Sequence, residues 1–174
     1  MRLRLAPAVR VPAVAAAVAV SAALALSGCA GSGVQREAPG AAQSSVRTSA
    51  DGTDLSLQGR NVDLQIAKAA VHLAAAGGAQ VEMTVTNAGP VTEHLAVASV
   101  GPHVANITGS SANPLSVAGV LIEGYNGTAQ FGAADGPKIT LPAGDAPKAG
   151  SKVTVMLQFG VAGMIRLDVP VLAS

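Results

Sequence analysis

Apolar and polar residues alternate with a period of two along five stretches of the chain, which is the pattern of half-buried β-strands. In the first, Val62, Leu64 and Ile66 share one face, and Asp63 and Gln65 lie on the other. Similar alternation recurs at 81–86, 94–98, 153–159 and 165–171. The residues expected to face the core are Val62, Leu64, Ile66, Val81, Met83, Val85, Leu95, Val97, Val153, Val155, Leu157, Phe159, Ile165, Leu167, Val169 and Val171.

Shorter apolar runs predict further strands at 55–57, 117–122 and 138–141, separated by segments rich in Gly, Pro, Asp and Asn. The alanines of Ile66–Gly78 are compatible with a helix, but the segment lies between two strand patterns, and we expect a strand followed by a loop. Pro170 lies on the outward side near the chain end, where an edge strand tolerates it. Residues 120–122 do not alternate, which predicts a strand buried on both faces or an edge under a loop; an exposed patch around Tyr125 is the alternative.

Seven to nine short antiparallel strands predict an all-β domain, either an antiparallel β-sandwich or a small Greek-key barrel. Some 124 residues from Asp51 onward are enough for one domain with its own core. We therefore place this β-sandwich domain at residues 51–174.

The first 28 residues have the features of an export signal. Arginines lie among the first ten residues, and an apolar stretch, Val11–Leu26, follows that is shorter than the ~20 residues of a spanning helix. The stretch ends in Leu26, Ser27, Gly28 and Cys29, which match the bacterial lipobox. This match implies signal-peptidase recognition at residues 26–28 and a lipid, such as palmitate, on Cys29.

Residues 29–50 are rich in Gly, Ser, Ala and Gln, and they carry too little apolar surface to offset the entropy of ordering them. We expect a flexible tether that holds the domain on the extracytoplasmic face of the cell membrane through lipidated Cys29. Because Cys29 is the single cysteine, the chain has no disulfide framework, cysteine zinc site or thiol nucleophile.

Charge and aromatic content exclude nucleic acid as a partner. Without residues 1–28 the chain has 8 basic and 10 acidic residues, a net charge of about −2. Stacking on bases is equally disfavoured, because Tyr125, Phe131 and Phe159 are the only aromatic residues. The sequence has no nucleophile elbow and no phosphate-binding glycine loop, so we expect no enzymatic activity.

Three segments resemble the periplasmic copper chaperone (PCuAC-type) domain family: "NVDLQIAKA" at 61–69, "VEMTVTNAGPVTEHLAVASV" at 81–100 and "PKAGSKVTVMLQFGVAGMIRLDVPV" at 147–171. The similarity spans roughly residues 60–172 and is closer still to exported actinobacterial lipoproteins of the Lpq type. The resemblance implies a cupredoxin-like or immunoglobulin-like sandwich that holds Cu(I) with histidine imidazoles and methionine thioethers.

The copper ligands of that family are missing at the corresponding positions. The ligand histidine would fall at Ile107 or Thr108, and the His-x-Met hairpin around 124–135, which contains neither residue type. Met83 lies on an apolar strand face, and Met156 and Met164 match ordinary positions of the family. We therefore expect no metal cofactor.

Two functional hypotheses follow. The first is a lipid-anchored, non-enzymatic binding or envelope-organising module, with the membrane and an envelope protein or lipid as partners. The alternative is a Cu(I) carrier with a rearranged site made of His94, His103 and a methionine. His94 follows Glu93 on the outward side of a strand and His103 lies beyond the strand's end, so sharing a metal would require the Gly101–Pro102 turn to fold one of them back.

Overall fold

A computed structural model describes residues 41–109 and 119–173. The expected signal segment, Leu26, Ser27, Gly28, the lipidation site Cys29 and the tether as far as residue 40 lie outside the described residues. In order, the elements are β1 (Ala41–Thr48), β2 (Thr53–Gly59), β3 (Val62–Leu73), β4 (Ala79–Asn87), β5 (Glu93–Val100), β6 (His103–Val104), β7 (Asn106–Thr108), β8 (Val120–Ile122), β9 (Gly127–Phe131), β10 (Lys138–Leu141), the 3₁₀ turn η1 (Ala143–Asp145), β11 (Lys152–Phe159) and β12 (Gly163–Leu172). Among these residues no helix is long and apolar enough to cross a membrane.

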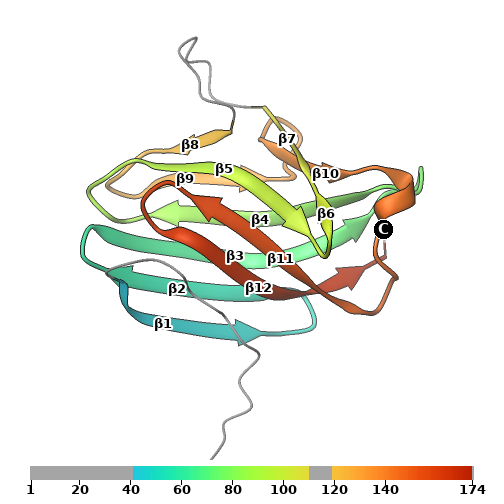
Figure 1. The fold of residues 1–174 in the computed structure, drawn as a ribbon, viewed down its shortest axis with the longest axis horizontal. Helices are drawn as coiled ribbons and strands as arrows, with labels where there is room; N and C mark the ends of the chain where they lie inside the picture. Colours follow the sequence, from blue (N-terminus) through green and yellow to red (C-terminus); the bar gives the residue numbers. More distant parts are fainter. Residues whose placement is uncertain (1–40, 110–118, 174) are drawn as a thin grey trace, which may run out of the picture.

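The strands form two layers that share β12 (Figure 1). In the smaller sheet, β5 pairs with β6, β8 and β11, and β11 pairs with β12. In the larger sheet the order is β1–β2–β3–β4, with β9 and β10 both on β4 and β7 on β10. Val171 and Leu172 of β12 also pair in parallel with Val71 and His72 of β3, which joins the layers. The expected all-β sandwich is confirmed.

The described part of the chain has twelve strands, more than the seven to nine expected. The additional strands are short, like β6 and β7, or poor in apolar residues, like β1. A strand of two or three residues is too short to show alternation in the sequence. The count predicted from hydrophobic periodicity was therefore too low.

The core lies between the layers and consists of aliphatic side chains with two phenylalanines. Leu64, Val85, Leu157 and Leu167 are completely buried, as the alternation predicted. At about 25 cal/mol per Å² of apolar surface removed from water, this core is the main stabilising term.

Val97 corrects the expected inward face of β5, because its side chain is 44% exposed. Gln158 pairs with Val97 and Phe159 with Leu95, so Ala96 is an extra residue, a β-bulge. After the bulge the inward positions move by one residue, and Ala98 and Val100 are buried instead.

β1 corrects the expected limits of the tether, which we had extended to residue 50. Residues 41–48 pair along their length with β2, from Ala41 opposite Gly59 to Thr48 opposite Thr53. Gln43, Ser44, Ser45 and Arg47 are exposed and polar, and Val46 is the one large apolar residue of the strand, so its sequence resembles that of an unfolded linker.

The alanine-rich segment after Ile66 continues β3 to Leu73 and then turns, as expected. A bulge at Lys68, whose amide donates to Asp54 Oδ1 at 2.8 Å, lets both Ala69 and Ala70 point into the core. β12 is bonded on one side by β11 as far as Pro170, and pairs with β3 only from Val171 onward. Pro170 therefore lies where the other side of its strand has no ladder partner among the described residues.

Candidate functional site

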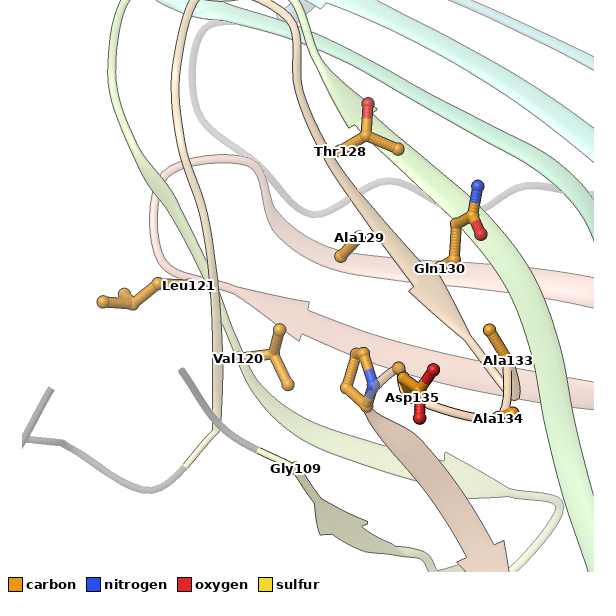
Figure 2. Close-up of a pocket in the computed structure, with 11 residues that line it drawn as sticks. Gly109, Val120, Leu121, Thr128, Ala129, Gln130, Ala133, Ala134 and Asp135 are labelled. Carbon is orange, nitrogen blue, oxygen red and sulfur yellow. The ribbon is translucent and has the colours of Figure 1, made fainter. Parts of the chain in front are cut away.

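A cavity of about 560 Å³ lies between β8 and β9. Its walls come from the end of β7, from β8, from β9 and from the turn that leads into β10 (Figure 2). The lining residues are Gly109, Val120, Leu121, Thr128, Ala129, Gln130, Ala133, Ala134, Asp135, Gly136 and Pro137. β8 belongs to the smaller sheet and β9 to the larger, so the cavity opens at the seam between the layers.

The turn at 132–137 forms one wall because it folds back tightly on β9. The Gly132 amide donates to Pro137 O at 2.9 Å, and the Gly136 amide to Ala133 O at 3.1 Å. A Cβ on Gly136 would lie 2.2 Å from Gln130 O, so no larger residue fits there. Figure 2 shows Thr128 and Gln130 on the opposite side of β9 from Ala129, which is buried.

The cavity wall carries little charge, and its polar atoms are oxygens and amide nitrogens rather than soft metal ligands. Val120 and Ala129 supply apolar surface, and Asp135 is the one ionisable side chain among the eleven lining residues. Those residues include no histidine, methionine or cysteine. Such a donor set suits neither the soft ion Cu(I) nor a nucleophilic mechanism.

Of the two segments that the family resemblance assigns to copper, 124–135 lines this cavity, and the chain just after Ile107 and Thr108 reaches it at Gly109. Ile107 is half-buried against the core in β7, Thr108 is exposed, and Gly109 begins the cavity wall. β7 pairs with β10, placing Thr108 opposite Lys138. Residues 124–135 form the β8–β9 turn, β9 and the start of the β9–β10 turn. The positions come together, but with threonine, alanine and glycine where a copper site requires imidazole and thioether.

His94 and His103 do not form a common site. His103 pairs with Val100 at the far end of β5, so six residues of extended strand, about 20 Å, separate it from His94. The Gly101–Pro102 turn folds the chain back by two residue pairs only, too few to bring the histidines together. Instead, His103 Nδ1 lies 3.2 Å from Asp145 Oδ1.

The remaining candidate ligands are also engaged elsewhere. His72 Nε2 lies 3.5 Å from Glu82 Oε2 on the larger sheet. Met83 is buried in the core. Within 41–109 and 119–173 no three His, Cys, Asp or Glu side chains are grouped closely enough to hold a metal ion.

Met156 and Met164 lie together on the outward face of β11 and β12, beside a guanidinium group. Arg166 donates from Nε to Met156 Sδ at 3.3 Å and from Nη2 to Met164 Sδ at 3.8 Å. A positive charge next to both thioethers opposes binding of a cation there.

The side chains of β8 alternate between buried and exposed, which corrects the expectation of a strand without alternation. Val120 and Ile122 are buried, whereas Leu121 is 37% exposed at the edge of the smaller sheet. Tyr125 is 78% exposed in the β8–β9 turn. Figure 2 shows Leu121 pointing away from the other lining side chains, so Leu121 adds little to the cavity.

Two buried polar residues for which the sequence suggested no role, Glu93 and Asn87, organise the turns where β5 begins. The Glu93 carboxylate is 2% exposed and accepts from the amides of Val161 at 3.0 Å and Ala162 at 2.7 Å, in the β11–β12 turn. Asn87 is 1% exposed. Asn87 precedes Ala88, Gly89 and Pro90 in a turn sequence, and this turn was the signal that could have identified it.

Asn87 ties together three segments of chain. Its amide group donates to Val91 O at 2.7 Å and to Ile122 O at 3.1 Å, and its Oδ1 accepts from the Gly89 amide at 3.1 Å. The backbone of Asn126 also donates to Asn87 O. These contacts hold the β4–β5 and β8–β9 turns against each other and are structural in character.

Comparisons with known proteins identify the fold and nothing finer. No family model matches the sequence, and no curated protein matches it. Among solved structures, the apo PCuAC domain of PmoF1 is similar with a TM-score of 0.53 at 23% identity, over 64% of this chain and 94% of that domain. The apo PCuAC domain of PmoF2 has a TM-score of 0.50 at 16% identity, over 63% and 90%. The copper-bound PCuAC domain of PmoF2 has a TM-score of 0.49 at 18% identity, over 64% and 93%.

The chain therefore has a PCuAC-like fold, as the resemblance implied. At these identities the similarity shows the arrangement of the strands alone.

Proposed function

We propose that the protein is a lipid-anchored, extracytoplasmic binding module that uses a PCuAC-like sandwich without a copper site. The observation that carries this proposal is the wall of the cavity between β8 and β9. Segment 124–135, which the resemblance assigns to copper, supplies much of that wall, and Gly109 follows the other assigned positions directly; the described lining offers alanine, glycine, threonine and glutamine rather than soft ligands. Among these lining residues Asp135 is the single ionisable side chain, and no histidine, lysine or cysteine lies beside it to act as a partner in catalysis, which favours a non-enzymatic role.

The anchoring part of the proposal rests on the lipobox Leu26-Ser27-Gly28-Cys29. Two acyl signals or more hold a protein at a membrane stably, since each buried CH₂ contributes roughly 0.8 kcal/mol. The domain would then stand on the outer face of the membrane within reach of the surrounding envelope.

Copper titration of the full chain in detergent tests the binding part. We expect no stoichiometric Cu(I) binding in competition with a micromolar-affinity chelator, and no copper in the protein as isolated. The double variant Met156→Leu/Met164→Leu is the matched control, because it removes the paired thioethers and leaves the cavity intact. Tight 1:1 binding by the unmodified chain would overturn the proposal, and its loss in the double variant would locate the site on β11 and β12.

Mass spectrometry tests the anchor separately. We expect the exported protein to begin at Cys29 with acyl chains attached and to fractionate with membranes. The Cys29→Ser variant should be released in soluble form, and a membrane-bound Cys29→Ser protein would contradict lipid anchoring at this residue.

A further inference from the structure

The exposed large apolar residues are concentrated at one end of the sandwich. Among the described residues there are six, and three of them lie in turns at this end: Val91 in the β4–β5 turn, Tyr125 in the β8–β9 turn and Val161 in the β11–β12 turn. A fourth, Leu121, lies in β8 next to the β8–β9 turn. Figure 1 shows these turns together at the left, with the β2–β3 turn and the start of β1. We call Val91, Tyr125 and Val161 the apolar turn tips.

Hydrogen bonds fix these turns relative to one another. The Tyr125 amide donates to Gly89 O at 2.8 Å, which seats the β8–β9 turn on the β4–β5 turn. The Gly89 amide donates to Asp63 O at 3.2 Å, which links the β4–β5 turn to the start of β3. Glu93 accepts from the Val161 amide and holds the β11–β12 turn beside β5. The apolar turn tips therefore belong to one surface that the fold holds in place.

Tyr125 occupies its turn at a cost in backbone energy. Its φ is +58° and that of Asn126 is +74°, so two successive residues adopt the left-handed conformation. Such turns normally contain asparagine and glycine, because a bulky side chain is unfavourable at positive φ. The Tyr125 side chain is 78% exposed, so packing against the core does not hold it there. A strained and exposed aromatic residue indicates a role outside the fold.

The opposite end of the sandwich has different chemistry. Its turns join β1 to β2, β3 to β4, β5 to β6 and β10 to β11, at 49–52, 74–78, 101–102 and 142–151. They contain no Val, Leu, Ile, Met or aromatic residue, and they carry three charged ones, Asp51, Asp145 and Lys148. The turns at the first end carry Arg60 and Glu123. The sandwich therefore has an apolar end and a polar end.

The chain enters the domain at the apolar end. β1 begins at Ala41, which pairs with Gly59 next to the β2–β3 turn. Eleven residues, 30–40, separate Ala41 from Cys29, and a chain of that length spans at most about 40 Å. β3, with twelve residues, is itself about 40 Å long. The polar end would thus reach a membrane that holds Cys29 only if the connecting chain were stretched along the whole domain, whereas the apolar end lies where that chain arrives.

We propose that the apolar turn tips rest on the lipid bilayer and orient the anchored domain with its apolar end towards the membrane. The valines bury apolar surface at the boundary of headgroups and acyl chains, and a tyrosine ring there keeps its hydroxyl among the headgroups. Arg60, exposed in the β2–β3 turn, supplies a guanidinium group for a lipid phosphate. The inference rests on the proposed function for the anchor at Cys29. That anchor supplies the affinity, and the tips, weak alone, set the orientation because they act at high effective concentration.

The fluorescence of Tyr125 tests the proposal, because the chain has one tyrosine and no tryptophan. The acylated exported protein is reconstituted in mixed vesicles of phosphatidylcholine and phosphatidylglycerol, and the soluble Cys29→Ser variant in buffer is the reference. We expect quenching by acrylamide, which stays in the water, to be at least about twofold weaker on the vesicles. A phospholipid with a nitroxide near its headgroup should quench the vesicle-bound protein. Unchanged acrylamide quenching, or no quenching by the nitroxide lipid, would overturn the proposal.

Substitutions at the other two tips leave the fluorescent residue in place. Val91→Asp/Val161→Asp puts carboxylates at two exposed positions, and acrylamide quenching should return to its value in buffer, because a charge opposes burial in lipid. The matched control is Val97→Asp/Val104→Asp, which changes the two exposed valines of the smaller sheet and should retain the protection. Full protection in the tip variant, or an equal loss in the control, would overturn the proposal.

Moving the tyrosine tests the orientation. Tyr125→Asn/Ala75→Tyr places the single tyrosine in the exposed β3–β4 turn at the polar end. Acrylamide should quench this variant equally with and without vesicles, and protection as strong as that of Tyr125 would contradict the orientation. Protection of Tyr125 that appears without vesicles and grows with protein concentration would assign the apolar end to a second copy of the chain, and would likewise overturn the proposal.

Failure of this inference can be distinguished from failure of the proposed function, because the mass of the protein is measured before reconstitution. An acylated, vesicle-bound protein whose Tyr125 is freely quenched by acrylamide would refute the orientation and leave the anchored module intact. A protein without acyl chains would refute the anchor. Coupling the Cys29 thiol to a maleimide lipid then restores an attachment at the same residue, and the same quenching experiment decides the inference.

Discussion

Two regions of this sandwich differ in how they use polar atoms. At the end where β5 begins, the buried side chains of Asn87 and Glu93 make five hydrogen bonds of 3.1 Å or less to backbone groups of neighbouring turns. The cavity between β8 and β9 is lined mostly by small side chains, and its one carboxylate, Asp135, is exposed. Backbone hydrogen bonds close the turn that forms one of its walls.

The comparison separates the fold from the chemistry of a site. The end held by Asn87 and Glu93 fixes how the turns of both sheets meet, and a change there leaves buried donors without acceptors. Residues of the cavity wall can be substituted at little cost in stability, because few of their side chains contact other parts of the structure. A PCuAC-like fold can therefore persist in a chain whose cavity has none of the ligands that copper needs.

The largest effect is expected from Glu93→Ala. The amides of Val161 and Ala162 lose a charged acceptor in a buried position, which should lower the free energy of unfolding by roughly 3–5 kcal/mol. Glu93→Gln keeps one acceptor oxygen and should cost about half as much. Urea unfolding followed by circular dichroism measures both, and equal costs for the two variants would mean that the carboxylate does not hold the turn.

A smaller effect, about 2–4 kcal/mol, is expected from Asn87→Ala. The carbonyls of Val91 and Ile122 lose their donor, and the Gly89 amide loses its acceptor. Asn87→Asp retains the acceptor for Gly89 but turns a carboxylate towards two carbonyl oxygens, so it should be at least as destabilising as alanine. An aspartate variant as stable as the native chain would show that the two donated bonds contribute nothing.

The smallest effect is expected at the cavity. Ala134 is exposed on the β9–β10 turn, and Ala134→His should change the free energy of unfolding by no more than about 0.5 kcal/mol. The same urea experiment measures it. A cost above about 1 kcal/mol would remove the distinction between the two regions, because the cavity wall would then also support the fold.

The parts of the fold that the sequence predicted are those governed by local alternation. Leu64 in β3, Leu157 in β11 and Leu167 in β12 face the core as expected, since a strand buried on one face must alternate. Val97 does not, because the bulge at Ala96 reverses the faces halfway along β5. β1 is a strand because it pairs with β2, and the polar sequence of β1 alone does not predict this pairing.

The candidate site depends on contacts that no single stretch of sequence contains. Thr108 and Ala133 lie far apart in the chain, and the pairing of β7 with β10 brings their segments to one cavity. The contacts of Glu93 are equally distant in sequence, since Val161 and Ala162 lie 68 and 69 residues away. That residues 107–108 and 124–135 contain neither histidine nor methionine, by contrast, is visible directly in the sequence.

The dual pairing of β12 has a consequence for when this protein acquires its structure. β12 follows every other strand in the chain, yet its residues complete the smaller sheet and its last two pair with β3 of the larger one. The join between the layers can therefore form only after residues 171 and 172 have been synthesised. A chain stalled a few residues short would keep both layers but lack the join between them.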